Sequence, residues 1–335
     1  MFKQKVKVFK IRVFLVTILS VFLVSALFSG CSMTSQQEKI TVVLDYVPNT
    51  NHTGLYVAKD LGYFEKEGIE VDLVQPPDGG ALSLLAAGKA QFGISFQEEL
   101  AMALSADSPL PVTAVATIIQ HNTSGIISLK KSNIKSPKDL EGKRYASWAM
   151  PIEKPLLTSI MKKDGGDFTK IKMIPTSGTD VIAELKTNID AVWIYYGWDG
   201  IAAEVKKLDF NYFAFKDIDP VFDFYTPIIV GNNDFLAKKP EFAKKFLSAV
   251  SKGYEYAIAN PEAAAKILVK YAPATDLEIA TKSQIYLAKQ YKAEVNVWGQ
   301  IDETRWTNFY KWLFDNQVIT KKLEGQGFTN EFLPK

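Results

Sequence analysis

The chain has 335 residues, a formal net charge of +2 and the apolar and charged fractions of an ordinary globular protein. This near-neutral balance gives no reason to expect nucleic acid as a partner. Cys31 is the only cysteine, so intrachain disulfides and zinc–thiolate sites are excluded. After it the sequence has only two arginines, Arg144 and Arg305. Few arginines are therefore available for a site that binds a phosphate or sulfonate through bidentate guanidinium contacts.

The first residues have the pattern of a secretory signal. Five basic residues lie within positions 3–12, and an apolar run from Val13 to Phe28 follows them. At about 16 residues this run is shorter than the ~20 that a membrane-spanning helix needs. Because a basic stretch, a short apolar stretch and small residues are typical of a cleaved signal, we expect residues 1–30 to be a signal peptide.

The cysteine that follows this run predicts a lipid anchor. Ser29, Gly30 and Cys31 form a small-residue cleavage site, although Phe28 stands where leucine is commoner. Cleavage before Cys31 leaves its thiol to carry a diacylglyceryl group, which holds the protein on the extracytoplasmic face of the membrane. Residues 31–39 are then a polar tether. A buried structural cysteine and an uncleaved membrane anchor are the alternatives.

From residue 40 onward, strand-like and helix-like segments alternate, which is typical of α/β architecture. The predicted strands are Ile40–Leu44, Val71–Val74, Phe92–Phe96, Val112–Ile119, Ile126–Leu129, Arg144–Trp148, Ile171–Ile174, Ala191–Tyr195 and Thr226–Val230. The predicted helices are Thr53–Glu67, Ala81–Ala87, Glu98–Leu104, Pro155–Lys163, Thr179–Lys186, Pro240–Ala259, Glu262–Tyr271, Leu277–Gln290 and Glu303–Phe314, with Asp276 and Asp302 as caps of the last two.

This order predicts a two-lobed, periplasmic-binding-protein-like fold of type II. Residues 40–128 and 229–335 form the first lobe, and residues 129–228 form an inserted second lobe. Two crossovers, near Gly125–Lys130 and Asp223–Val230, act as the hinge. Ligands of such folds bind at the carboxyl ends of the strands, so we expect a ligand cleft between the lobes.

Several segments resemble one family of binding proteins. The stretch from Leu44 to Ala58 is similar to the start of bacterial thiamine-pyrimidine-binding proteins, the formylaminopyrimidine-binding components of ABC importers. Three further segments share this likeness: 151–153 (PIE), 193–198 (WIYYGW) and 223–227 (DFYTP). Gly62–Val71 and Gly142–Arg144 are shared more widely, with alkanesulfonate, nitrate and taurine binders. The resemblance extends over nearly the whole chain after the signal.

The same superfamily includes a eukaryotic enzyme that makes hydroxymethylpyrimidine from its own histidine and pyridoxal phosphate. The resemblance places Ser95 where that enzyme has its cofactor lysine and Glu99 where it has its donor histidine. The segment before Thr226 has none of the enzyme's cysteines. A Schiff base requires a lysine, so we expect this chain to have no cofactor and not to be an enzyme. Motifs of hydrolases, metalloproteases and nucleotide-binding loops are also missing, and we predict no metal site.

A pyrimidine is a flat ring with polar edges, so its site needs aromatic walls and a few aimed polar groups. The first candidate segment follows the strand 40–44 and contains Asp45, Tyr46, Asn49, Asn51 and His52. Asp45 and Asn51 have an alternative role as caps of the next helix. A histidine at a helix start is also a common structural residue, which is the alternative for His52.

Two further segments complete the predicted site. The loop after the strand 191–195 contributes Tyr195, Tyr196 and Trp198, and interlobe packing is the alternative for these rings. Trp148, with Glu153 as a carboxylate partner, occupies a similar position after another strand. The third segment is the second crossover, with Asp223 and Tyr225, where hinge packing around a solvated Asp223 is the alternative.

The sequence thus predicts a monomeric substrate-binding protein whose ligand is a thiamine pyrimidine precursor, formylaminopyrimidine or hydroxymethylpyrimidine. Its expected partners are an ABC permease with its ATPase, and the membrane through the lipid on Cys31. Another small ligand, either a riboflavin precursor or an alkanesulfonate, is the alternative, and a pyrimidine synthase is the rival from another class.

Overall fold

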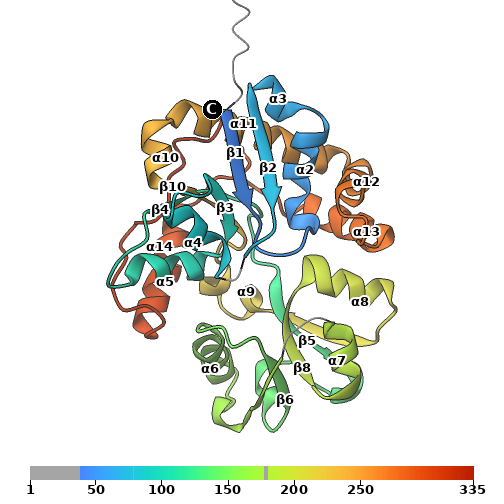
Figure 1. Ribbon diagram of the computed structural model, residues 1–335. Coiled ribbons are helices and arrows are strands. Elements are labelled where there is room, and N and C mark those ends of the chain that lie inside the picture. Colours follow the sequence, from blue (N-terminus) through green and yellow to red (C-terminus); the bar gives the residue numbers. More distant parts are fainter. Residues whose placement is uncertain (1–37, 78, 177–179) are drawn as a thin grey trace, which may run out of the picture. The chain divides into compact units, whose positions relative to one another are not determined.

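The computed structural model describes residues 38–77, 79–176 and 180–335 (Figure 1). The predicted signal peptide, Cys31, the tether up to residue 37 and the predicted helix start at Thr179 lie outside the described residues. Residues 38–335 form one compact unit with two five-stranded sheets.

The first sheet has the strand order β2-β1-β3-β10-β4. Its first three strands are parallel, and β10 runs antiparallel to β3 and β4. Every residue of β3 and β10 is buried, as expected for strands that are covered on both faces. The bounds are β1 Glu38–Val43, β2 Ile69–Val74, β3 Phe92–Ser95, β4 Val112–Thr117 and β10 Ile228–Asn232.

The second sheet has the order β7-β6-β8-β5-β9, in which β7, β6 and β8 are parallel and β5 is antiparallel to β8 and β9. The bounds are β5 Ser124–Leu129, β6 Arg144–Ser147, β7 Lys172–Pro175, β8 Ala191–Tyr195 and β9 Phe210–Ala214. Strand β9 is missing from the sequence prediction, because most of its residues are half-buried and the paired residues of β5 lie 81 to 89 positions earlier.

Helices cover both faces of each sheet (Figure 1). One face of the first sheet packs on α4, α5 and α14, and the other packs on α2, α3, α11 and α12. In the second sheet, α6 and α9 cover one face and α7 and α8 the other. The bounds are α2 Thr53–Asp60, α3 Tyr63–Lys66, α4 Gly80–Ala86, α5 Gln97–Ser105, α6 Glu153–Lys163, α7 Val181–Thr187, α8 Ile201–Val205, α9 Phe215–Ile218, α10 Asn233–Lys238, α11 Pro240–Ala259, α12 Pro261–Tyr271, α13 Leu277–Ala288 and α14 Glu303–Asp315.

Six short helical turns complete the element order. They are η1 Thr50–His52, η2 Lys130–Ser132, η3 Pro137–Leu140, η4 Phe168–Lys170, η5 Tyr196–Gly200 and η6 Pro220–Phe222. Of these, η5 is a π-helical turn, a geometry that occurs often at functional sites.

The predicted helix over residues 53–67 is wrong as a single element. Gly62 adopts a left-handed conformation with φ 67°, so the chain ends α2 and begins α3 at this point. Leu55 and Ala58 before the break and Phe64 after it are all buried, whereas Leu61 is half-buried.

The chain passes between the two sheets at residues 118–123 and 215–227. The first passage precedes the predicted boundary at residue 128, because β5 pairs with β8 and β9 of the second sheet. The second passage ends where β10 re-enters the first sheet. The division into two lobes that move about these passages remains a proposal.

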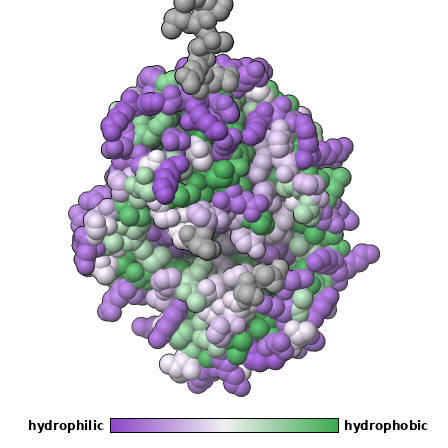
Figure 2. Space-filling model, viewed as in Figure 1, coloured by the Kyte–Doolittle hydropathy of each residue, from purple (hydrophilic) through white to green (hydrophobic). Residues whose placement is uncertain are grey.

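On the face seen in Figure 2, hydrophilic side chains dominate the rim and hydrophobic ones form separate patches. Among residues 38–77, 79–176 and 180–335, no helix combines the length and the apolarity required for a membrane span.

Candidate functional site

The carboxyl ends of β3 and β8, one from each sheet, are linked by an aromatic contact. Phe96 follows β3 directly and Tyr195 is the last residue of β8. Their rings stack with centroids 6.5 Å apart and an interplanar angle of 14°. This contact places the strand ends of the two sheets opposite each other, where ligands of such folds are expected to bind.

The charges of three carboxyl groups act on the Tyr195 phenol. Burial raises the pKa of Tyr195, and the charges of Glu98, Asp45 and Asp199 raise it further. Asp45 follows β1, Glu98 lies in the first turn of α5 and Asp199 lies in η5, so these groups arrive from three separate strand ends. We call Asp45, Phe96, Glu98, Tyr195 and Asp199 together the inter-sheet site.

Asp45 is held in place by His52. The His52 Nε2 atom lies 2.5 Å from the Asp45 carboxylate, and Nδ1 accepts the backbone N–H of Asn49 at 3.2 Å. Because Nδ1 accepts, the ring proton is on Nε2 and is donated to Asp45. The His52 side chain is fully buried and that of Asp45 is 8% exposed. The geometry therefore favours the structural role for His52, with Asp45 as the group at the surface of the site.

The other residues of this predicted segment either make structural hydrogen bonds or are exposed to solvent. Asn49 is the cap of η1 and accepts the N–H of Asn51, so neither Asp45 nor Asn51 caps the helix as the alternative proposed. The backbone oxygen of Asn51 accepts the Tyr254 hydroxyl at 2.6 Å. Tyr46 is 53% exposed beside this segment.

Glu98 is the most unusual group in the site, and the sequence prediction did not include it. Its side chain is buried, and the atom Oε2 has no hydrogen-bond partner among the described residues. Burial raises the pKa of Glu98 to about 8, and the neighbouring Glu99 carboxylate adds to the increase. The available signal was its place in the sequence, three positions after the end of a buried strand.

Asp199 was missed for a similar reason. It follows Trp198 within the predicted aromatic loop, where only the rings were considered. Burial raises the pKa of Asp199 to about 6, so this carboxyl titrates close to neutral pH. Perturbed carboxyl groups at the end of a strand are typical of binding sites.

Glu153, by contrast, has no free acceptor capacity for a ligand. Its carboxylate accepts from the hydroxyls of Tyr145 (3.0 Å) and Ser147 (2.8 Å) and from the backbone amides of Trp148 (3.1 Å) and Met150 (3.3 Å). It therefore fixes the loop that carries Trp148. The Trp148 indole N–H donates to the backbone oxygen of Trp193 at 3.0 Å, which holds its half-buried ring beside the end of β8.

Side chains of the aromatic loop have different roles, because Tyr195 belongs to the inter-sheet site whereas Tyr196 packs against other segments. Tyr196 hydrogen-bonds to Glu204, and its ring contacts Tyr212 and Tyr286 at 4.8 and 5.4 Å. Since Tyr286 belongs to α13, this is packing between segments of the two sheets, the alternative stated for Tyr196. Trp193 is 1% exposed and part of the core. Trp198 is half-buried in η5, between Tyr195 and Asp199 in sequence.

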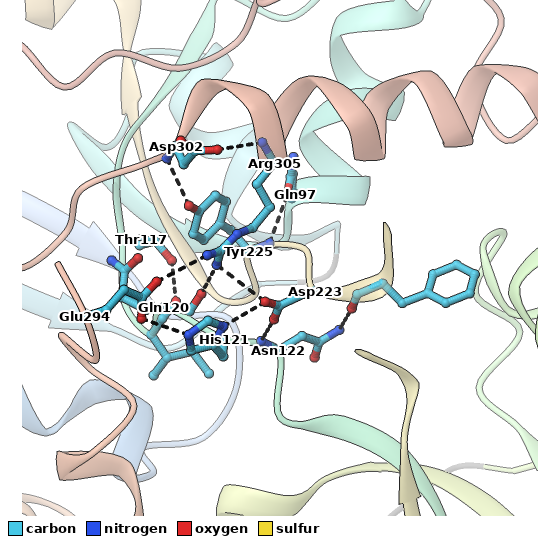
Figure 3. A network of polar contacts seen from close by, with 12 residues as sticks. Gln97, Thr117, Gln120, His121, Asn122, Asp223, Tyr225, Glu294, Asp302 and Arg305 are labelled. Carbon is cyan, nitrogen blue, oxygen red and sulfur yellow. Dashed lines mark hydrogen bonds and ion pairs between the residues drawn. The ribbon is translucent and has the colours of Figure 1, made fainter. Parts of the chain in front are cut away.

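Asp223 and Tyr225 belong to a different network, at the passages between the sheets (Figure 3). Asp223 accepts from His121 at 2.7 Å and from the Asn122 amide at 2.8 Å, and Arg305 lies 3.7 Å away. Burial alone raises the pKa of Asp223, but the hydrogen bonds from His121 and Asn122 outweigh it and lower the pKa. Asp223 is thus paired, so the alternative of hinge packing around a solvated Asp223 is wrong on this point.

The same network extends to the start of α14. The Tyr225 hydroxyl accepts the Asp302 amide at 2.9 Å, and the Arg305 guanidinium lies 4.9 Å from the Tyr225 ring centroid (Figure 3). His121 also contacts Glu294 at 2.9 Å. We call His121, Asp223, Tyr225, Glu294 and Arg305 the hinge network. Tyr225 is 1% exposed, so the geometry gives it a packing role and no accessible face for a ligand.

A cavity of about 810 Å³ adjoins the hinge network, not the inter-sheet site. Its lining mixes both charges, with Lys216, Lys311 and Arg305 among Asp217, Asp302 and Asp315. Of the predicted site residues it contains only Asp223. Within the described residues no group of histidine, cysteine and acidic side chains is arranged to hold a metal ion.

Comparisons with known proteins agree with this architecture. A family model described as NMT1/THI5 like matches residues 49–264. The formylaminopyrimidine-binding protein of Halalkalibacterium halodurans is 27% identical over 316 residues, which cover 92% of this chain and 93% of the relative. A 4-amino-5-hydroxymethyl-2-methylpyrimidine phosphate synthase of Saccharomyces cerevisiae is 25% identical over 266 residues, which cover 73% and 74%.

Among solved structures, the alkanesulfonate-binding protein of Xanthomonas axonopodis pv. citri bound to MOPS is similar, with a TM-score of 0.66 and 14% identity. The match covers 85% of this chain and 96% of that one. The sulfonate-binding protein of Escherichia coli gives a TM-score of 0.67 at 17% identity. The predicted periplasmic-binding-protein fold of type II is thereby confirmed.

Proposed function

Since the chain belongs to the NMT1/THI5-like family, we propose that it is the substrate-binding component of an ABC importer and captures a thiamine pyrimidine precursor. The ligand is formylaminopyrimidine or hydroxymethylpyrimidine. The similarity to a formylaminopyrimidine-binding protein over 92% of the chain supports this choice of ligand.

The observation that carries the proposal is the composition of the inter-sheet site. Phe96 and Tyr195 supply flat apolar rings, and a pyrimidine binds well when it stacks against such rings. Asp45 and Asp199 supply carboxylates, which accept strong hydrogen bonds from an exocyclic amino group. Rings and acceptors at facing strand ends match an electron-poor, amino-bearing heteroaromatic ring.

The same composition disfavours a sulfonate. Both arginines of the described residues have acidic partners away from this site. Arg144 forms a two-pronged contact with Asp190 at 2.9 and 3.1 Å, and Arg305 belongs to the hinge network. An anion placed among Asp45, Glu98 and Asp199 would meet further negative charge or buried acid, without a guanidinium to offset it.

We infer that the chain is not an enzyme. The position expected for a cofactor lysine is Ser95, which is buried and whose hydroxyl donates to Glu99 at 2.5 Å. A hydroxyl paired with a carboxylate cannot form the Schiff base that the pyridoxal-dependent synthase requires. Glu99 stands at the position of the donor histidine and offers no imidazole.

The proposal includes the extracytoplasmic location and the partners expected from the sequence. Cleavage of residues 1–30 and lipidation of Cys31 would hold a monomer on the outer face of the cell membrane. Closure about the passages at 118–123 and 215–227 would then present the loaded protein to a permease that a separate ATPase drives.

The experiment is calorimetric titration of the full chain in detergent with formylaminopyrimidine, hydroxymethylpyrimidine, thiamine and an alkanesulfonate. We expect micromolar or tighter binding of the pyrimidines alone. Trp198→Ala should weaken this binding more than tenfold if its ring stacks on the ligand, since tenfold corresponds to about 1.4 kcal/mol. Tyr271→Ala, which removes a 36%-exposed ring, is the matched control. Sulfonate binding without pyrimidine binding would contradict the proposed ligand.

A further inference from the structure

Glu98 is placed where a carboxyl group has no structural reason to be. Its side chain is 3% exposed in the first turn of α5, and Oε2 has no partner among the described residues. An unpaired buried polar atom costs free energy, so folded proteins keep few of them without a use. Its neighbour Gln97 shows the usual arrangement, because its side chain bonds both to the Tyr225 amide at 2.8 Å and to the Trp306 oxygen at 3.2 Å.

The groups around Glu98 place it within the inter-sheet site. Its charge raises the pKa of Tyr195, the phenol that stacks on Phe96 across the two sheets, and also that of Tyr310 on α14. The Tyr310 hydroxyl is buried and also has no partner. Glu98 therefore lies between the core of the first sheet and the ring that faces the second.

The protonation state of Glu98 decides what it offers to a ligand. With a pKa raised to about 8 by burial, the group is predominantly a neutral carboxylic acid at pH 7. Its own backbone amide hydrogen-bonds to the carboxyl, which leaves Oε2 as the free oxygen. A carboxylic acid that carries its proton there is a hydrogen-bond donor.

We propose that Glu98 selects the ligand through a ring nitrogen: its buried Oε2–H donates a hydrogen bond to the unprotonated pyrimidine nitrogen next to the carbon that carries the amino group. This inference rests on the proposed function, which supplies the aminopyrimidine. The proton stays shared between Oε2 and the ring nitrogen, and no covalent bond forms or breaks. The ring then stacks beside Tyr195, while its amino group faces the carboxylates of Asp45 and Asp199.

This arrangement makes a distinction that aromatic stacking alone cannot make. In a 4-oxo analogue of the pyrimidine, the ring nitrogen beside the carbonyl carries a hydrogen and no longer accepts. A donor would then face a donor, and the carbonyl would face the carboxylates in place of an amino group. Sites built on buried hydrogen bonds reject such mismatches far better than apolar pockets reject small changes of size.

The test uses full-length protein in detergent and calorimetric titration with 4-amino-5-hydroxymethyl-2-methylpyrimidine and its 4-oxo analogue. Glu98→Ala and Glu98→Leu should weaken binding of the amino compound more than tenfold. Glu98→Gln should bind within about threefold of the wild type, because its Nε2–H donates from the same place. The wild type should bind the oxo compound at least tenfold more weakly than the amino compound.

The pH dependence separates the inference from a merely structural role. Wild-type affinity should fall as pH rises from 7 to 9.5, since the ionised carboxylate no longer donates, whereas Glu98→Gln should not share that loss. The titratable groups that face Glu98 are Glu99 on α5, Tyr195 at the end of β8 and Tyr310 on α14. All three are present in both proteins, as are Asp45 and Asp199 beyond Tyr195, so the difference between the two profiles isolates Glu98.

The two proposals fail in different ways. If the wild type binds no pyrimidine, the proposed function fails, and this inference fails with it. If the wild type binds the amino compound while Glu98→Ala binds equally well, or if the wild-type and Glu98→Gln pH profiles run parallel, the inference alone is overturned. Should Glu98→Ala and Glu98→Leu not fold, as judged by circular dichroism, the Glu98→Gln profile decides.

Discussion

His52→Ala tests whether a buried histidine sets the position of Asp45. The fully buried imidazole makes two hydrogen bonds, one to the Asp45 carboxylate at 2.5 Å and one from the Asn49 amide at 3.2 Å. The substitution removes both bonds and leaves the Asp45 carboxylate, which is 8% exposed, without the only partner that the described residues provide.

The expected loss follows from the burial of this pair. Removal of the donor leaves a buried, charged acceptor unsatisfied, which costs about 3 kcal/mol, because the neutral imidazole supplied the carboxylate with a hydrogen bond. Asp45→Asn should cost much less, about 1–2 kcal/mol, since the amide oxygen still accepts the Nε2–H and only the charge assistance is lost. We therefore expect a larger loss of unfolding free energy for His52→Ala than for Asp45→Asn, because only His52→Ala removes the hydrogen bond between the two side chains.

Urea unfolding followed by circular dichroism measures both free energies, and Asp45→Ala together with the double variant His52→Ala/Asp45→Ala completes a cycle with His52→Ala. We expect a coupling energy of at least about 1.5 kcal/mol, the range for hydrogen bonds to charged groups. The matched control is His121→Ala, because His121 is the other histidine of the chain and its side chain is 27% exposed. A loss below about 1 kcal/mol for His52→Ala, or additive single effects, would refute the reasoning.

Two further predictions concern the frame of the site. In Gly253→Ala, the new Cβ on α11 would lie 2.0 Å from the Gly54 carbonyl oxygen of α2, so the two helices must separate. Unfolding free energy should fall by about 2 kcal/mol or more, although alanine normally stabilises a helix by about 1 kcal/mol; a more stable variant in urea would contradict the close approach. The Asp223 hydrogen bond raises the pKa of His121, so its stabilisation is complete below pH 6.5 and is lost as pH rises through the folded-state value. Thermal unfolding from pH 5.5 to 9 should show a larger loss in the wild type than in His121→Asn, in which only the buried carboxyls of Glu98 and Asp199 still oppose folding as they ionise.

The sequence predicts elements well where local signals are sufficient. The helix Pro240–Ala259 has the predicted bounds, and Asp276 and Asp302 cap their helices as expected. The break at Gly62 was missed, because the apolar spacing of residues 55–64 continues across it and gives no sign of the left-handed turn. Only the conformation of one glycine distinguishes one long helix from two short ones.

Long-range contacts explain the errors about the site. Asp223 was expected to face either a ligand or solvent, but its partner His121 is 102 positions away and folds back onto it. Glu98 was not considered, because its burial depends on the packing of α5 against α14. No local pattern marks a carboxyl that tertiary structure will enclose.

The acidic residues can be ordered by how much hydrogen-bonding capacity the fold leaves them. Glu153 accepts four hydrogen bonds, which fix its loop and leave no acceptor capacity for a ligand. Asp223 accepts hydrogen bonds from His121 and Asn122 at the passages between the sheets. Asp45 has one donor, His52, and the free Oε2 of Glu98 has none. Because a buried acceptor or donor without a partner is costly, the unused capacity at Asp45 and Glu98 indicates where a ligand completes the structure. Both residues lie near the strand ends beside Tyr195. The missing hydrogen-bond partners and the position in the fold therefore both indicate the inter-sheet site as the place where a ligand binds.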